Sequence, residues 1–231
     1  LGGDDVVSGG SGKDRNYGRG GKDELLGEGG IDTLFGGAGQ DVLTGGRGGD
    51  TINGGGGIDQ ADYATATTGV RVDMQAPATN TGDAAGDTLI SIENLGGSDF
   101  NDDLRGDSAD NRILGRNGKD TLRGQEGDDL LIGGRGRDTL IGGQGDDVMR
   151  GGQGVDRFVY DGGDDIILDF GNDKLKLNDA LWGNATLSNA QILALANVVG
   201  SDTVFTFDGG NTLTLQGYTD IAGLTSHLEI F

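Results

Sequence analysis

One apolar residue in every nine is the clearest hydrophobic pattern in this chain of 231 residues. The repeating frame has two glycines, a spacer, a glycine, a second spacer and an aspartate, followed by three residues of which the middle one is apolar. GGAGQDVLT at 36–44 is a full copy. The frame runs without a slip over residues 9–62 and again over 97–159. A fixed short period predicts a repeat architecture rather than an ordinary globular core.

The sixth position is aspartate in thirteen of fourteen copies, and the eighth is apolar in thirteen of fourteen. The exceptions are Asn111 at the sixth position and Asn16 at the eighth. A three-residue strand points one side chain inward, so one apolar residue per unit suits a thin core between two sheets. Glycine permits the sharp turns between strands. Two units would therefore complete one lap of a flattened coil of parallel strands.

Composition indicates what must hold such a coil together. The chain has 50 glycines and only 33% hydrophobic residues, too few to offset the entropy of ordering the backbone. Its formal charge is −21, with 33 Asp against 5 Glu. Stacked aspartates would lie about 4.8 Å apart and repel each other, so the columns need cations. Carboxylate and carbonyl oxygens suit Ca²⁺, and roughly ten ions would nearly cancel the charge.

Units such as GGAGQDVLT, GGRGRDTLI and GGQGDDVMR resemble the haemolysin-type calcium-binding repeats of the RTX (repeats-in-toxin) family. The resemblance implies an all-β fold, a right-handed parallel β-roll stacked on Ca²⁺, in two blocks with a C-terminal β-rich cap containing one short helix. It also implies that calcium is held by the turn carbonyls and by the aspartate side chain of each unit. Phe100 and Ala109 replace the fourth glycine in two units.

In the first block, the residues implied as calcium ligands are Asp14, Gly18, Gly20, Asp23, Gly27, Gly29, Asp32, Gly36, Gly37, Ala38, Gly39, Asp41, Gly45, Gly46, Arg47, Gly48, Asp50, Gly54, Gly56 and Asp59. In the second block they are Asp102, Gly115, Asn117, Gly118, Asp120, Gly124, Glu126, Gly127, Asp129, Gly133, Gly134, Arg135, Gly136, Asp138, Gly142, Gly143, Gln144, Gly145, Asp147, Gly151, Gly152, Gln153, Gly154 and Asp156.

The domain organisation that we expect is a first roll block at 1–62, a β spacer at 63–96, a second roll block at 97–159 and a capping region at 160–231. Alternating Val70, Val72 and Met74 predict a strand in the spacer, with a loop near Pro77. The spacer resembles those of many secreted RTX proteins, including calcium modules of bacterial alginate epimerases. The chain begins within a repeat unit, so we expect it to be part of a longer protein.

The tail changes character after Phe158. Ser188 and Gln191 form a capping-box pattern that predicts a helix over NAQILALANVV at 189–199, ending at Gly200. Alternation on both sides of DGGN at 208–211 predicts a hairpin. The final LTSHLEIF resembles RTX C-termini that carry a type I secretion signal. Packing of its apolar residues under the hairpin is an equally good explanation.

Other chemistry has little support in the sequence. The chain has no cysteine and a single histidine, His227, so a nucleophilic site is not expected. Trp182 is expected to be a packing residue rather than a sugar platform. Five turn arginines are expected to be solvated counter-charges, with a lesser possibility that they hold an acidic polysaccharide; they are Arg19, Arg47, Arg116, Arg135 and Arg137.

Three functions compete. The favoured one is a calcium-binding module, secreted by bacterial type I export, that folds on Ca²⁺ outside the cell and supports secretion and folding of an upstream domain. The second is an extracellular adhesion or polysaccharide-binding module. The third is the non-catalytic calcium module of a secreted protease, lipase or alginate epimerase. We expect a monomer whose partners are calcium and the export apparatus, without nucleic acid or a membrane span.

Overall fold

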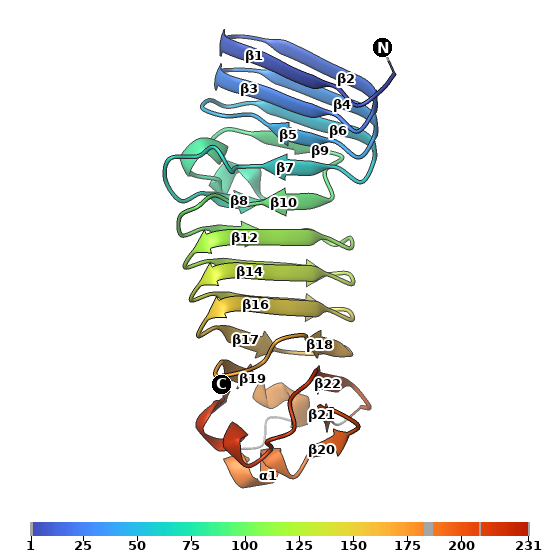
Figure 1. The fold of residues 1–231 in the computed structure, drawn as a ribbon, viewed down its shortest axis with the longest axis vertical. Coiled ribbons are helices and arrows are strands. Elements are labelled where there is room, and N and C mark those ends of the chain that lie inside the picture. Colours follow the sequence, from blue (N-terminus) through green and yellow to red (C-terminus); the bar gives the residue numbers. More distant parts are fainter. Residues whose placement is uncertain (1, 183–186, 208, 231) are drawn as a thin grey trace.

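The computed structural model describes residues 2–182, 187–207 and 209–230. These residues form a long coil whose strands stack along the long axis, with the N-terminal laps at one end and a smaller β-rich cap at the other (Figure 1). Within the coil, neighbouring strands pair in parallel. The predicted parallel β-roll with a β-rich cap and a short helix is confirmed.

One face of the coil is a continuous 12-stranded sheet. Its strands, in spatial order, are β1 (Val6–Gly12), β3 (Glu24–Gly30), β5 (Val42–Thr44), β7 (Gln60–Asp62), β10 (Asn94–Gly96), β12 (Arg112–Gly118), β14 (Leu130–Gly136), β16 (Val148–Gly154), β18 (Asp165–Ile167), β22 (Thr212–Leu215), β21 (Asp202–Thr206) and β20 (Ala196–Val199). This sheet contains strands from both roll blocks, the spacer and the cap, so it joins them through continuous strand pairing.

The opposite face is divided into two sheets. The first contains β2 (Arg15–Gly21), β4 (Thr33–Gly39), β6 (Thr51–Gly57) and β9 (Thr88–Ile90). The second contains β8 (Arg71–Asp73), β11 (Asp103–Arg105), β13 (Thr121–Glu126), β15 (Thr139–Gln144), β17 (Arg157–Tyr160), β19 (Lys174–Leu177) and β23 (Leu228–Ile230). The division falls in the segment that interrupts the nine-residue period.

Strand register shows that two repeat units make one lap. Leu131 on β14 lies opposite Met149 on β16, and Leu122 on β13 lies opposite Leu140 on β15, which are steps of 18 residues. The eighth-position side chains form the thin core between the two faces. Those with no exposed surface are Leu25, Leu34, Leu43, Ile52, Ala61, Leu104, Ile113, Leu122, Leu131, Leu140, Met149 and Phe158.

The spacer inserts an extra strand into the divided face. β8 comes first in the chain but pairs with β11 of the second block, whereas β9 comes later and pairs with β6 of the first block. β10 then pairs with both β7 and β12 and restores the regular coil. Between β8 and β9 lie two 3₁₀ turns, η1 (Pro77–Thr79) and η2 (Gly82–Ala84), at the expected loop.

The tail confirms the predicted hairpin and corrects the predicted helix. β21 and β22 pair antiparallel around the expected turn, of which Asp208 lies outside the described residues. The capping box between Ser188 and Gln191 is present, but helix α1 (Asn189–Leu193) is only five residues long. The prediction of helix through 199 is wrong, because Ala196–Val199 instead form β20 and pair antiparallel with β21.

The cap covers the last laps of the coil with aromatic side chains. The rings of Tyr160 and Phe207 stack at 4.9 Å, and Phe170 packs edge-on against Tyr218 at 5.3 Å. Two further 3₁₀ turns, η3 (Asp179–Trp182) and η4 (Gly223–Ser226), complete the cap. β23 extends the second face by pairing with β19, and Phe231 lies outside the described residues. Among the described residues, no helix has the length and apolar character needed to cross a membrane.

The core predicts a difference between inward and outward positions of one strand. Leu131→Ala should lower the free energy of unfolding of the calcium-loaded chain by about 2–5 kcal/mol, because it opens a cavity beside Ile113 and Met149. Ile132→Ala, at the neighbouring half-buried position, should cost clearly less. Urea unfolding followed by circular dichroism measures both. Equal losses would contradict the one-residue core.

Candidate metal centre

The sixth-position aspartates form two buried columns, one along each edge of the coil. In each column one carboxylate oxygen, Oδ1, accepts the backbone N–H of the aspartate one lap earlier. Asp138 Oδ1 accepts from Asp120 at 2.9 Å, and Asp156 Oδ1 accepts from Asp138 at 2.9 Å. Asp138 is fully buried and Asp120 and Asp156 are 1% exposed. From Asp23 on, the column aspartates are therefore held in place by the lap above them.

The second carboxylate oxygen, Oδ2, has no hydrogen-bond donor in twelve aspartates of the two columns. They are Asp14, Asp23, Asp32, Asp41, Asp50, Asp59, Asp120, Asp129, Asp138, Asp147, Asp156 and Asp165. Among the described residues, every buried side-chain oxygen that lacks a donor is one of these Oδ2 atoms. Buried polar atoms are nearly always paired in native proteins, so a regular series of unpaired oxygens indicates a missing positive partner.

The first glycine of each turn leaves room beside the unpaired oxygen. A Cβ atom placed on Gly115 would lie 2.6 Å from Asp120 Oδ2 and 2.6 Å from the carbonyl oxygen of Gly133 in the next lap. At Gly133 the corresponding distances are 2.5 Å to Asp138 Oδ2 and 2.7 Å to Gly151 O. A carboxylate oxygen of one lap and a carbonyl oxygen of the next therefore face the same small space.

The electrostatics oppose closing these columns without a cation. Burial, together with the charge of Asp138, raises the pKa of Asp120 to about 8, although the hydrogen bond from the Asp102 N–H lowers it. Burial likewise raises the pKa of Asp138 to about 6. An unpaired buried polar atom costs about 1–3 kcal/mol. Twelve such atoms would together cost about 12–36 kcal/mol, as much as or more than the about 5–15 kcal/mol that stabilises a typical domain.

The donor set fits calcium. Within the described part of the chain, no three His, Cys, Asp or Glu side chains gather around one point, so backbone oxygens must supply most of the ligands. Carboxylate and carbonyl oxygens from two laps form a hard, all-oxygen environment, which Ca²⁺ accepts with its six to eight flexible ligands. Histidine and cysteine, the side chains that zinc prefers, are not present in the turns.

The remaining glycines of the frame serve the backbone. Gly136, at the fourth position, has φ of +146°, and a Cβ there would collide with the carbonyl oxygen of Gly118 one lap away. The third position tolerates side chains because only its backbone takes part: Arg47 O accepts the N–H of Gly30 at 2.8 Å, and the Arg47 side chain is exposed. Arg47 could thus contribute only its carbonyl to a metal ion.

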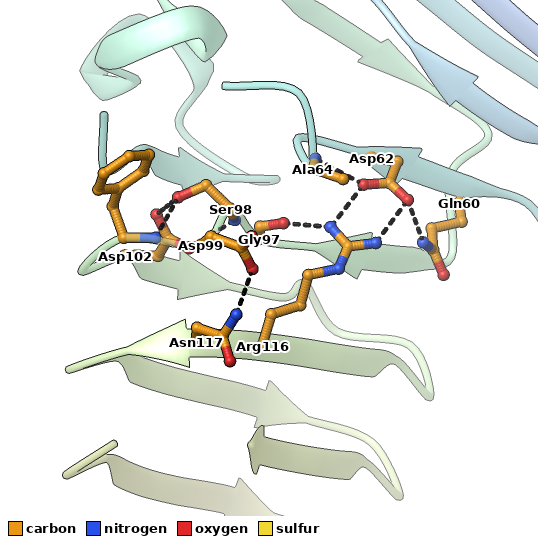
Figure 2. Close-up of polar contacts among 10 residues, drawn as sticks. Gln60, Asp62, Ala64, Gly97, Ser98, Asp99, Asp102, Arg116 and Asn117 are labelled. Carbon is orange, nitrogen blue, oxygen red and sulfur yellow. Dashed lines mark hydrogen bonds and ion pairs between the residues drawn. The ribbon is translucent and has the colours of Figure 1, made fainter. Parts of the chain in front are cut away.

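Two turns at the start of the second block differ from the rest. Asp102 is already satisfied. Its Oδ2 accepts the N–H of Ser98 at 2.7 Å and its Oδ1 accepts the Ser98 hydroxyl at 2.8 Å (Figure 2). The Val70 N–H also donates to Oδ1, at 2.8 Å. At the next turn, the Asn111 side-chain amide donates to Glu93 O at 2.9 Å. The sequence departs from the frame at both turns, and neither has an unpaired carboxylate oxygen.

The columns also contain residues that the sequence reasoning missed. Asp165 Oδ1 accepts the N–H of Asp147, and continuing the nine-residue count past Asp156 would have found it. Asp87 and Glu93 accept the N–H groups of Asp50 and Asp59, as a sixth-position aspartate would. These two lie in the spacer, where the period is lost, so sequence spacing gives no signal for them.

Arg116 corrects an expectation. It was expected to be a solvated turn arginine, but its side chain is 23% exposed and its guanidinium forms a two-pronged ion pair with Asp62, at 2.7 and 2.8 Å (Figure 2). It also donates to the carbonyl oxygen of Gly97. Arg19, Arg47, Arg135 and Arg137 have exposed side chains.

Comparison with protein families decides the identity of these repeats. The family model of the RTX calcium-binding nonapeptide repeat matches residues 1–25, 26–61, 96–131, 123–158 and 132–167, which together cover more than half of the chain. The chain belongs to the RTX calcium-binding repeat family. The RTX repeat is a calcium-binding unit, in agreement with the donor set of the two columns.

A comparison with curated protein sequences gives no match. Among solved structures, the RTX chain is similar to the extracellular lipase LipA from Serratia marcescens, with 22% identity and a TM-score of 0.43. The match covers 98% of this chain and 38% of the lipase chain.

The unpaired oxygens predict which aspartates control calcium affinity. Asp138→Asn combined with Asp147→Asn keeps an oxygen for the N–H of the lap above but replaces each Oδ2 by an amide. This double change should raise the calcium concentration at the folding midpoint about tenfold or more. The measurement is a calcium titration followed by circular dichroism.

The matched control for this change is Asp128→Asn combined with Asp146→Asn. These fifth-position aspartates are exposed and accept the N–H groups of Asp146 and Asp164. The control also removes two charges, but it leaves the columns intact. An equal shift of the midpoint in both double variants would show that net charge, rather than the Oδ2 atoms, sets the affinity.

Proposed function

We propose that this chain is a calcium-driven folding module of a secreted bacterial protein, exported by a type I apparatus, and that it is not itself catalytic. The observation that carries the proposal is the series of twelve buried Oδ2 atoms without donors. Such columns are costly when the carboxylates are ionised and unscreened, and they become favourable when calcium lies between laps. Calcium binding and folding would then be a single event.

The calcium gradient across the cell envelope would give this coupling a direction. Extracellular calcium modules bind with dissociation constants of about 10⁻⁴–10⁻³ M. The free calcium of the cytosol is too dilute to saturate sites of this affinity. Inside the cell the mutual repulsion of the aspartates would keep the chain extended and fit for export. Outside, calcium would close the laps and prevent return, and the folded coil would support an upstream domain.

The parts of the chain suit different stages of this process. We propose the divisions 1–62, 63–96, 97–159 and 160–231 as roll block, spacer, roll block and cap. In the last of these, β20, β21 and β22 continue the 12-stranded sheet beyond β18 and so cover the end of the calcium-bound laps. The final residues are proposed to carry the export signal before they pack as β23.

A second candidate, binding of an acidic polysaccharide, is favoured by one groove. A cavity of about 380 Å³ is lined by Lys119, Arg137, Arg157 and Lys174, a concentration of positive charge on a chain of net charge −21. Glu229 pairs with Arg157, and the other acidic residues at the groove, Asp138 and Asp156, are buried. The remaining cations could hold carboxylate groups of a polymer.

Calcium dependence of folding tests the main proposal. Circular dichroism of the full chain should change from a largely disordered spectrum in EDTA to a β spectrum in about 1–10 mM calcium. Magnesium at the same concentration should be much less effective, because it retains its waters and demands a stricter geometry. A β spectrum that persists in EDTA would remove the proposal.

Retention on an immobilised polyuronate in calcium buffer tests the second candidate. The chain should be retained, and Lys119→Glu combined with Arg137→Glu should abolish retention by reversing the charge of the groove. Arg19→Glu combined with Arg47→Glu changes net charge equally at exposed positions outside the groove and should have little effect. Equal losses would indicate unspecific charge attraction, and no retention would exclude polyuronate binding.

A further inference from the structure

Arg116 occupies a strained position in its turn. It stands at the second position of its turn, where the frame has glycine, and its φ is +79°. Such a conformation is uncommon for a residue with a side chain and strains the backbone. The guanidinium then reaches back along the coil to Gly97, one lap earlier, and to Asp62, two laps earlier (Figure 2).

The lap that begins at Asp62, the farther of the two that Arg116 reaches, lacks an aspartate at the column position. In the regular coil, the N–H of one aspartate donates to Oδ1 of the next, as Asp102 does to Asp120 at 2.9 Å. Above Asp102 the donor is Val70, at 2.8 Å. Val70 therefore stands at an aspartate position but has no carboxylate to offer a metal ion.

The carbonyl oxygen of Gly97 is affected directly. At regular laps the first-position carbonyl lies beside the unpaired Oδ2 of the preceding lap, as Gly133 O does beside Asp120 Oδ2. With Val70 in the preceding lap, Gly97 O has no such carboxylate partner, and the guanidinium of Arg116 donates to it instead. A fixed positive charge thus sits where the column would otherwise continue.

Other carboxylates at this junction, where the spacer meets the second block, also have donors from the protein. The Tyr63 hydroxyl donates to Asp87 Oδ2 at 3.0 Å, and the Ser98 backbone N–H and hydroxyl both donate to Asp102. Asp62 accepts from Gln60 and from the backbone of Ala64, in addition to Arg116 (Figure 2). The junction therefore differs from both blocks, whose Oδ2 atoms are unpaired.

We propose that the guanidinium of Arg116 takes the place of a calcium ion at this step, bound by Asp62 and Gly97 O, and so joins two separate calcium stacks. The inference rests on the proposed function, in which calcium fills the columns elsewhere. Arginine suits the role because its planar guanidinium is always charged and binds carboxylate oxygens in pairs. The stability of the junction then does not change with calcium concentration, whereas the stability of the blocks on either side does.

Arg116→Gly is the direct test, since glycine is the frame residue at this position and adopts positive φ without strain. Removal of the guanidinium leaves Asp62 and Gly97 O available to a metal ion. Arg19→Gly is the matched control, because Arg19 has the same frame position and a φ of +85° but an exposed side chain. Both changes relieve the same backbone strain.

The experiment measures amide hydrogen exchange of the full chain at about 1 and about 20 mM calcium, together with bound calcium by equilibrium dialysis. Useful probes are the amides of Tyr63 and Gly97, which donate to Gly96 O and Leu114 O across the junction. In Arg116→Gly these amides should exchange about tenfold faster or more at the lower calcium concentration and recover at the higher one. The variant should also bind an additional ion at saturation, and Arg19→Gly should match the natural chain.

Two results would overturn the inference alone while the blocks remain calcium-dependent. One is junction exchange in Arg116→Gly equal to that of Arg19→Gly. The other is faster exchange that calcium does not reverse, without an additional ion, which would make Arg116 an ordinary ion-pair partner. Failure of the proposed function gives a different result: block amides of the natural chain, such as those of β14, would stay protected in EDTA.

Discussion

In the proposed function, the fold depends on the attraction between a divalent cation and carboxylate oxygens that the protein itself leaves without donors. Each sixth-position aspartate gives one oxygen to the backbone of the lap above, which fixes its position, and presents the other to a space shared with a carbonyl of the next lap. The core contributes one buried side chain per unit, such as Leu131 or Leu140. With so thin a core, metal binding must supply much of the stability that apolar burial supplies in other domains.

The same requirement explains the composition. The first glycine of a turn, such as Gly133, is small because a side chain would fill the space beside Asp138 Oδ2, whereas the fourth, such as Gly136, is needed for its backbone angle and its close approach to the next lap. Where the chain departs from this plan, at Ser98 and Arg116, its own donors replace the missing partner. The spacer thus interrupts the columns, and none of its own buried carboxylate oxygens lacks a donor.

Much of this was predictable from sequence because a strict period turns local spacing into three-dimensional stacking. The frame predicted that Leu122 and Leu140 face one core and that Asp120 and Asp138 share one column. It could not predict that β8 and β9 exchange partners, because that pairing depends on contacts between distant laps. The helix predicted over 189–199 failed for a related reason: pairing with β21 overrides a local helical pattern at Ala196–Val199. The pairing of Arg116 with Asp62 was not predicted, because a side-chain contact between residues two laps apart does not change the repeat pattern.

The central claim is tested most directly by an X-ray structure of the chain crystallised in calcium, with anomalous data collected at long wavelength. The account predicts strong anomalous peaks about 2.3–2.6 Å from the Oδ2 atoms of both columns, each between two laps. A well-ordered coil in which those oxygens contact only water, without metal peaks along either column, would contradict it.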